Sequence, residues 1–582
     1  MKILRLELRH FRGFEDITIV PEGHVALVGE PRAGRSDLIE GLRRALTPDG
    51  VRFTVPDELD FFDADVTKRA EVEVVIGELD GALEQEFFDH LEAWDSDTKD
   101  IAEPVSPTEE DPEEEAEWVV RLCYRVAWDA ELERADHWVD FPAESDPDTD
   151  DYAKVPRRLI ATLPVSVSNA SSSPLGLGPR SAFRRLVDKA EGEDFAAALE
   201  GLLTQVEEAS LPFAESKQVQ AALSGVLNPL YRNLGINAEA ADDLLRFLPD
   251  GGSLSGVLRS LAPAMDLGPP GHLPLRRHGS TTTTLLQVGE ALADIDGQDS
   301  VVAFDDFGEG LDGPSAKHLA ATLRRRAGQT WMSTRRAAAM EAFAPKEVVR
   351  LHLKPDGQRS IGQIAPPTTR AARIAARHLH LQLLPAASAR AVAIVEGPHD
   401  RAALEALADR LFAARGRALP AAHGIVIVDA GAAEGSGGSS AVVRLAAFAT
   451  ELGFHTTAVI DWDRNDAPEI LAAARTAAIA VIRLPEGFAI ERALTSGLTD
   501  TQVTTALRAL HAGFDAPLPP NLDALAGDAL HGAARKMLKS TGGLHAQFVQ
   551  LLPTNVYPPV ARRLLKNLVD CGRTKKVGYK QL

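Results

Sequence analysis

Four acidic residues in the C-terminal third of the chain have the types and spacing of a metal-dependent site. Glu396 and Asp400 follow one buried-strand pattern, and Asp461 and Asp463 follow a second one. In an open α/β sheet, ligands bind at the edge formed by the carboxyl ends of the strands. Carboxylate oxygens at such an edge suit Mg²⁺ or Mn²⁺. We therefore predict that these four residues bind metal and support phosphoester chemistry; the alternative is that they cap helices and face solvent.

A second group of residues, near the N-terminus, has the spacing of a phosphate-binding loop. Gly29, Gly34, Arg35 and Ser36 fit the pattern G-x-x-x-x-G-K-[S/T], except that Arg35 replaces the lysine. The loop lies between a strand-like run and a helical run, so the helix N-terminus would add its partial positive charge to a bound phosphate. Because the planar guanidinium does not mimic a compact ammonium, we expect nucleotide binding and leave hydrolysis open. A structural turn rich in glycine is the alternative.

A later strand-like run ends in two further acids, Asp305 and Asp306. A hydrophobic strand that closes on an acid is the Walker B arrangement, in which Asp305 would hold Mg²⁺ and Asp306 would stand at the position of the catalytic acid. In ABC-type ATPases, a strand that ends in a switch histidine usually follows, but residues 330–336 contain no histidine. Residues 278–286, which lie where the signature loop of that class should be, lack its usual sequence. These departures leave ATP hydrolysis open.

The elements that must position these groups follow from hydrophobic periodicity. Alternating strand patterns occupy most of the first 130 residues, and helical periodicity replaces them at about 180–265. Residues 355–368 are rich in proline and glycine, which indicates a linker. Strand and helix patterns alternate again after residue 390. The sequence therefore predicts an α/β multidomain chain.

Composition limits the class of protein. The 582 residues have a net charge of −22, of which −10 lies in the acidic segment 95–117. Two cysteines, far apart, favour a reducing compartment over a disulfide or zinc framework. No apolar run approaches the roughly 20 residues that a membrane span needs, so we expect a cytoplasmic protein without a membrane partner.

Together these motifs resemble known families. The opening residues 4–14, the 29–36 loop and the Asp305–Asp306 pair resemble the split ABC-type ATPase head of the SMC group, in which the residue matching Arg12 often lies near the nucleotide. The strand-end acids resemble the Toprim domain of topoisomerases, primases and certain nucleases, and so does the turn at 428–431. In the nuclease branch, an acid matching Glu491 often joins the metal cluster, and a lysine such as Lys536 or Lys539 assists catalysis.

An ABC/SMC-like ATPase head with a helical insertion, followed by a Toprim (Rossmann-like) α/β domain, resembles the OLD (overcoming lysogenization defect) family of ATP-dependent endonucleases. The resemblance implies a head at 1–180 and 271–354, a dimerising helical insertion at 181–270, a linker at 355–388 and a Toprim domain at 389–582. It implies ATP and Mg²⁺ or Mn²⁺ as cofactors, DNA as substrate, a homodimer, a possible protein partner and a role in phage defence.

The expected mechanism is hydrolysis of a phosphodiester with two metal ions, one held by Asp461 and Asp463 and the other by Glu396 and Asp400, with Glu491 assisting. Three alternatives stay open. The first is a strand-transferase, which needs a nucleophilic tyrosine such as Tyr557 or Tyr579. The second is a sensor that binds nucleotide and nucleic acid without cutting. The third is a nuclease that acts on RNA.

Overall fold

The computed structural model describes most of the chain. The described residues are 1–102, 117–169, 175, 183, 186–187, 216–227, 245–248, 262–269, 271–294, 299–431, 438–462, 467–540, 543–575 and 577–582. They form two compact units, which we treat separately. Residues 1–28 and 34–349 make up the first unit, and residues 29–33 and 350–582 make up the second.

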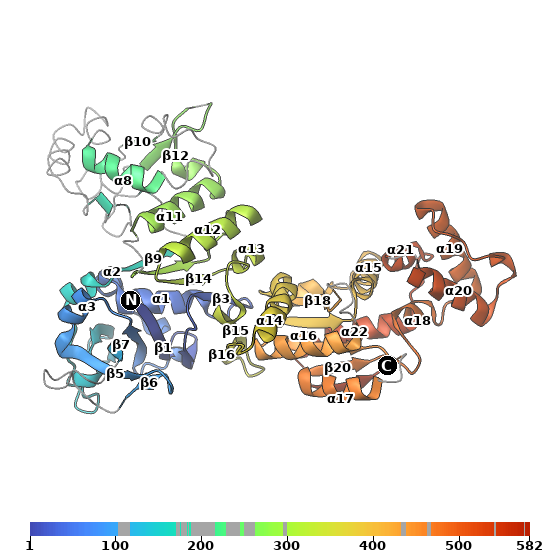
Figure 1. The fold of residues 1–582 in the computed structure, drawn as a ribbon, viewed down its shortest axis with the longest axis horizontal. Helices are drawn as coiled ribbons and strands as arrows, with labels where there is room; N and C mark the ends of the chain where they lie inside the picture. The colour runs from blue at the N-terminus through green and yellow to red at the C-terminus, as the bar shows by residue number, and fades with distance from the viewer. Residues whose placement is uncertain are drawn as a thin grey trace. The chain divides into compact units, whose positions relative to one another are not determined.

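The first unit begins with an antiparallel sheet in the order β2-β1-β4-β7-β5-β6, with β8 on β7 (Figure 1). Its main strands lie where the period-two alternation predicts them, because one face of each strand is buried. The strands are β1 (Lys2–Phe11), β2 (Phe14–Ile19), β4 (Ala70–Gly77), β5 (Leu91–Asp95), β6 (Asp100–Ile101), β7 (Glu117–Asp129) and β8 (Arg134–Asp140).

A parallel arrangement in the same unit contains the strands that lead to the nucleotide motifs. β3 pairs with β14, β14 with β13, and β13 with β9. β3, β13 and β14 are almost entirely buried, as expected for parallel strands covered on both faces. The strands are β3 (Val25–Gly29), β9 (Val165–Asn169), β13 (Val301–Asp305) and β14 (Gln329–Ser333).

Helices complete the first unit. They are α1 (Arg35–Leu46), α2 (Pro48–Phe53), α3 (Gly81–Glu86), α4 (Arg157–Thr162), α8 (Lys217–Leu227), α11 (Ser280–Asp294), α12 (Gly313–Arg326) and α13 (Ala337–Met340). Within the expected helical insertion at 181–270, the structure describes α8 and the strands β10 (Leu245–Leu248) and β11 (Ala262–Met265); β12 (Leu273–Pro274) follows it. Most of that segment, and most of the acidic segment 95–117, lies outside the described residues.

The second unit is built on a parallel sheet in the order β18-β17-β19-β20-β21. Successive residues of β17 point to opposite faces: Val392 and Ile394 join one hydrophobic core, and Ala393 and Val395 join the other. Helices α14, α16 and α17 contribute to the first core, and α15 and α18–α22 contribute to the second (Figure 1). The sheet is therefore covered on both faces.

The elements of the second unit follow in chain order. They are β15 (Val348–Leu353), in which the chain enters this unit, β16 (Arg359–Gln363), α14 (Arg370–Leu383), β17 (Ala391–Val395), α15 (Pro398–Arg415), β18 (Ile425–Asp429), α16 (Ser439–Glu451), β19 (His455–Ile460), α17 (Ala467–Ala477), β20 (Ala480–Arg483), α18 (Ile490–Thr495), α19 (Asp500–Phe514), α20 (Gly527–Ser540), α21 (His545–Leu551), α22 (Pro559–Thr574) and β21 (Gly578–Gln581).

The stretch 355–388, expected to be a linker, contains β16 and α14. Thr369 caps α14 by accepting a hydrogen bond from the N–H of Ala372, and Ala376 and Leu383 are buried in a core of the second unit. The helix is therefore part of the folded unit.

Both cysteines, Cys123 and Cys571, are buried and free. In the part of the chain that the structure describes, no helix combines the length and apolar character needed to cross a membrane.

Candidate metal-binding and nucleotide-binding sites

The first acidic motif lies where β17 gives way to α15. The N–H of Gly397, the residue before the helix, donates a hydrogen bond of 3.0 Å to Oδ2 of Asp400 in the first turn. This bond fixes the Asp400 carboxylate at the carboxyl end of the strand. Asp400 is only 9% exposed. Burial, followed by the charges of Glu396 and Glu491, raises its pKa to about 7 even though the Gly397 N–H opposes the shift.

The second member of this motif, Glu396, is held by a neighbouring helix. Its Oε1 accepts a hydrogen bond from the hydroxyl of Ser439, a buried residue at the start of α16. The turn after β18 packs beside it: the N–H of Ala430 donates to the Val395 carbonyl at 3.0 Å. A Cβ on Gly431 would lie 3.0 Å from the Glu396 carbonyl oxygen, so this turn favours glycine. Sequence reasoning missed Ser439, because only tertiary structure brings it to Glu396.

The second acidic motif follows β19, the strand beside β17. Asp461 comes directly after the strand, at the same edge of the sheet as Glu396. Backbone hydrogen bonds join Trp462 to the loop before α18: its N–H donates to Phe488 and its carbonyl accepts from Gly487. The same loop leads to Glu491, so the β19 end and the start of α18 are tied together. Asp463 lies outside the described residues.

Glu491 lies in α18 beside two basic side chains from later helices. Nε2 of His545 lies 3.5 Å from one carboxylate oxygen, and Nζ of Lys539 lies 3.7 Å from the other. Burial alone would raise the pKa of Glu491, but His545 and Lys539 outweigh it and lower that pKa. The sequence predicted Lys539 as a candidate and missed His545, which only the tertiary fold brings to Glu491.

His399 is partly covered. Its ring stacks on that of His545, with centroids 4.9 Å apart and an angle of 6° between the planes. Burial, and then the charge of His545, lowers the pKa of His399. The pair links the first turn of α15 to α21.

The carboxylates fit a divalent cation in chemistry. Asp400 feels the negative charges of Glu396 and Glu491 inside a buried environment, which a cation would relieve. All the donors are carboxylate oxygens, which Mg²⁺ prefers. Within the described ranges, which omit Asp463, no three acidic, histidine or cysteine side chains already converge as a preformed ligand set.

In the first unit, Ser36 of the 29–36 loop and Asp305 at the end of β13 are in direct contact. Ser36 donates a hydrogen bond of 3.1 Å to Oδ1 of Asp305, which also accepts one of 2.6 Å from Ser333. The N–H of Asp306 donates to Ser333 as well, at 2.8 Å. β13 and β14 are parallel neighbours, and this register brings their ends together. A hydroxyl beside a carboxylate can hold Mg²⁺ of a bound nucleotide.

Arg35, which replaces the lysine, begins α1 directly after Gly34. Gly34 has φ +97°, a left-handed conformation that glycine adopts without strain. The Arg35 guanidinium is largely buried and donates to the Thr334 carbonyl at 3.1 Å. Burial, followed by the like charge of Arg335, lowers the pKa of Arg35. A bound anion would relieve this crowding.

Gly29, the first glycine of the loop, has φ +141° and belongs to the second unit. A Cβ at this position would lie 2.0 Å from the Leu351 carbonyl oxygen. Here glycine is required by the close approach of another backbone, whatever the loop binds.

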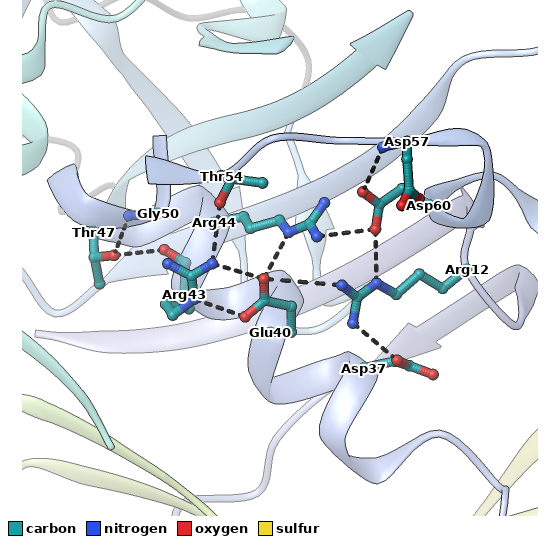
Figure 2. Close-up of polar contacts among 10 residues, drawn as sticks. All are labelled: Arg12, Asp37, Glu40, Arg43, Arg44, Thr47, Gly50, Thr54, Asp57 and Asp60. Carbon is teal, nitrogen blue, oxygen red and sulfur yellow. Dashed lines mark hydrogen bonds and ion pairs between the residues drawn. The ribbon is translucent and has the colours of Figure 1, made fainter. Parts of the chain in front are cut away.

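Arg12 belongs to an ion-pair network around α1 (Figure 2). Its Nε donates to Asp60 at 2.9 Å and its Nη1 donates to Asp37 at 3.1 Å, while Glu40 lies 4.0 Å away. Asp60 also accepts from Arg44 at 2.9 Å. Arg12 therefore ties the β1–β2 turn to the helix that follows the phosphate loop, a connection that positions α1.

The C-terminal acids fall within a recognised domain. Residues 389–463 match the family model described as "Overcoming lysogenization defect protein-like, TOPRIM domain". This segment is similar to the Toprim domain of OLD-like proteins. We call it the Toprim-like segment; it spans Glu396, Asp400, Asp461 and Asp463, and Glu491 follows it. The expected α/β multidomain fold with a Toprim domain near the C-terminal end is confirmed.

Comparison with solved structures finds SMC heads. One is the SMC head bound to the C-winged helix domain of ScpA, at 12% identity over 63% of this chain and 98% of that chain, with a TM-score of 0.35. Another is the SMC head domain from Thermotoga maritima, at 11% identity over 63% of this chain and 100% of that chain, with a TM-score of 0.29. No curated protein matches the chain.

Proposed function

We propose that the chain is a metal-dependent nuclease whose Toprim-like segment hydrolyses phosphodiester bonds of DNA. The environment of Asp400 carries the proposal: a buried carboxylate at a strand end, with a pKa raised to about 7 by burial and by Glu396 and Glu491. Perturbed carboxylates of this kind cluster at functional sites. The excess negative charge favours a divalent cation, through which an acidic protein can engage phosphate.

The side chains have distinct roles in this proposal. Glu396 and Asp400, oriented by Ser439 and by the Gly397 N–H, bind one side of the metal site. Asp461 and Asp463 bind the other side, and Glu491 assists. Bound Mg²⁺ would supply activation of a water molecule and stabilisation of the leaving oxygen. The chain's own task is to hold the carboxylates in place before substrate arrives.

The test uses supercoiled plasmid with Mg²⁺ or Mn²⁺, with and without ATP. We expect nicked or linear DNA from the wild type and at least a hundredfold loss with Asp400→Asn or with Asp461→Ala/Asp463→Ala. Asp409→Asn is the matched control, because Asp409 is an exposed acid on the same helix, α15. It should cut as the wild type does.

A parallel reaction contains single-stranded and structured RNA in place of the plasmid. Cleavage of RNA alone, abolished by the same variants, would keep the nuclease and replace its substrate. Intact DNA and RNA with every metal would refute the nuclease and favour a sensor that only binds. A covalent protein–DNA adduct would indicate a strand-transferase.

We further propose that the first unit binds ATP with Mg²⁺ and regulates cleavage. The contact between Ser36 and Asp305 and the crowding of Arg35 by Arg335 support this. Ser36→Ala should weaken ATP binding at least tenfold in a fluorescence titration. Ser145→Ala, which removes a hydroxyl bonded to the Phe141 carbonyl, is the control. Equal ATP affinity in both variants would contradict the proposal.

The resemblance to the OLD family supports two finer proposals. We expect a homodimer, which light scattering would detect as twice the mass of the chain.

We also expect a role in phage defence, so phage should form fewer plaques on cells that express the wild type than on cells that express the Asp461→Ala variant.

A further inference from the structure

A hollow lies in the second unit, farther along α15 than the acidic motifs. It has a volume of about 280 Å³ and is formed by the end of α15, the segment before β18 and one face of α22. Its apolar lining includes Leu411 and Leu565, which are buried, together with Pro420 and Val569. Such a lining favours a ligand with an apolar part.

The rim of this hollow is basic. Arg562, Lys566 and Arg573 come from one stripe of α22, at spacings of four and seven residues, and Arg417 approaches from the segment after α15. Residues four apart are neighbours on a helix, and like charges at that spacing repel one another. The stripe therefore gathers positive charge at a cost that a bound anion would offset.

The protein supplies few partners that could neutralise the positive charges of these basic side chains. The one acid in the lining, Asp570, lies 3.7 Å from Arg573. Within the described ranges, no side-chain hydrogen bond or ion pair engages Arg417, Arg562 or Lys566. Other basic side chains of this unit do have partners: Arg410 donates to four backbone carbonyls, and Lys575 contacts Glu30 and the Leu353 carbonyl, whereas exposed ones such as Arg444 and Arg563 are solvated.

The hollow is distinct from the proposed nuclease site. Asp400 lies in the first turn of α15, whereas the hollow is lined by Ala408 and Leu411 of the same helix. At 1.5 Å per residue these positions are roughly 12–17 Å farther along the helix axis. The hollow also borders the start of β18, whereas the acidic motifs follow the ends of β17 and β19.

We propose that this hollow binds a small organic phosphate of mononucleotide size: an apolar ring against Leu411 and Leu565, and a phosphate among Arg562, Lys566 and Arg417. The volume limits the occupant to a compact group, and charge-assisted hydrogen bonds to phosphate are strong. A duplex carries its phosphates on an outer surface and cannot fill a hollow with an apolar floor. The same chemistry is offered by a free nucleotide and by the 5′-phosphorylated end of a single strand.

The experiment is calorimetric titration of the full chain with thymidine 5′-monophosphate in the presence of EDTA. We expect one saturable site, and no binding of thymidine, which lacks the phosphate. Arg562→Gln/Lys566→Gln should weaken binding at least tenfold. Val569→Trp, which fills the hollow and keeps its charges, should weaken it by a similar factor.

The matched control is Arg444→Gln/Arg563→Gln. It removes the same charge from two exposed arginines, on α16 and α22, that do not line the hollow. It should bind within twofold of the wild type. Titration with 5′-phosphorylated and 5′-hydroxyl oligothymidylates then identifies the source: tighter binding of the phosphorylated strand indicates a strand end, and equal, weak binding indicates the free nucleotide.

Absence of saturable binding at millimolar nucleotide would overturn the proposal, as would equal affinity in the Arg562→Gln/Lys566→Gln variant. Binding of duplex DNA alone, lost in that variant, would overturn it in favour of a nucleic-acid surface. Because EDTA removes metal, the Asp461→Ala/Asp463→Ala variant should bind the nucleotide as the wild type does. A negative result in the nucleotide titration would therefore refute the binding proposal and leave the nuclease proposal unaffected.

Discussion

Nε2 of His545, at the start of α21, lies 3.5 Å from Oε1 of Glu491 in α18. His545 is 1% exposed and stacks on His399, so its ring has little freedom to move away. His545 therefore connects Glu491, the proposed assisting carboxylate, to His399 in the first turn of α15. We infer that His545 is a positioning residue, which sets the charge and orientation of Glu491.

Replacement of His545 by Leu should raise the pKa of Glu491, because the burial that raises it would lose one of its two basic counterweights. We expect roughly tenfold slower plasmid cleavage and a pH–rate profile displaced toward higher pH. His531→Leu is the control, since His531 forms a similar pair with Asp500, at 3.5 Å, away from Glu491. An unchanged pH profile in His545→Leu would contradict the positioning role.

Ser439→Ala should slow cleavage with little effect on folding, because it removes the hydroxyl that donates to Glu396. A hydrogen bond to a charged group contributes about 1.5–3 kcal/mol, which corresponds to a rate loss of roughly tenfold to a hundredfold. Ser440→Ala, at the exposed neighbouring position, should have no effect. Equal rates for both variants would show that Glu396 needs no such support.

Asp400→Asn should stabilise the metal-free protein at alkaline pH while it abolishes cleavage. The pKa of Asp400 is about 7 in the folded chain, above its ordinary value, so the folded state favours the protonated carboxyl group. The stabilising contribution of this protonated form is complete in acid. That contribution is lost as the pH rises from about 4 through about 7. Asn does not ionise, so at pH 8 in EDTA the variant should gain about 2–4 kcal/mol, measured by urea unfolding.

Excess Mg²⁺ should reverse this difference by stabilising the wild type, because metal binding competes with the proton for the carboxylate. Lower stability of Asp400→Asn in EDTA at pH 8 would contradict the buried-charge argument.

Glu40→Gln should reduce the acid sensitivity of the first unit. Burial alone would raise the pKa of Glu40, but its bonds to Arg43 and Arg44 lower that pKa to about 2 (Figure 2). Because the folded pKa is depressed, the stabilising contribution is present above about pH 4.5 and is lost as the pH falls toward 2. This contribution is at most about 3 kcal/mol.

The measurement is urea unfolding at pH 7 and pH 3. The wild type should lose more stability between the two pH values than Glu40→Gln does. Glu58→Gln, at an exposed acid, should behave as the wild type does. The same pH dependence in all three proteins would mean that the network in Figure 2 does not stabilise the fold.

The strand-end motifs could be predicted from the sequence because each is local. Glu396 and Asp400 immediately follow the apolar run of β17, and the order of strand, turn and helix is written in consecutive residues. Ser439 and His545 could not be predicted, because their relation to Glu396 and Glu491 depends on how helices pack on the sheet. No spacing in the sequence encodes that contact.

The proline- and glycine-rich stretch 355–368 shows why composition alone was insufficient. Gly357, at φ +92°, and its neighbours form the turn between β15 and β16, and Thr369 then caps α14. Prolines and glycines here mark the ends of short elements rather than an unstructured linker. The apolar stripe of α14, which includes Ala376 and Leu383, was the signal of a packed helix.

The sheet beneath the acidic motifs is completed late along the chain. β21, at Gly578–Gln581, pairs with β20, at Ala480–Arg483, and the intervening segment supplies Glu491, Lys539 and His545. Since N-terminal parts emerge first from the ribosome, β17 and β19 appear long before these partners. β3 is likewise synthesised before β14, with which it pairs, and before β13, which pairs with β14. We therefore expect the proposed acidic site to assemble only after the segment with Glu491, Lys539 and His545 has left the ribosome.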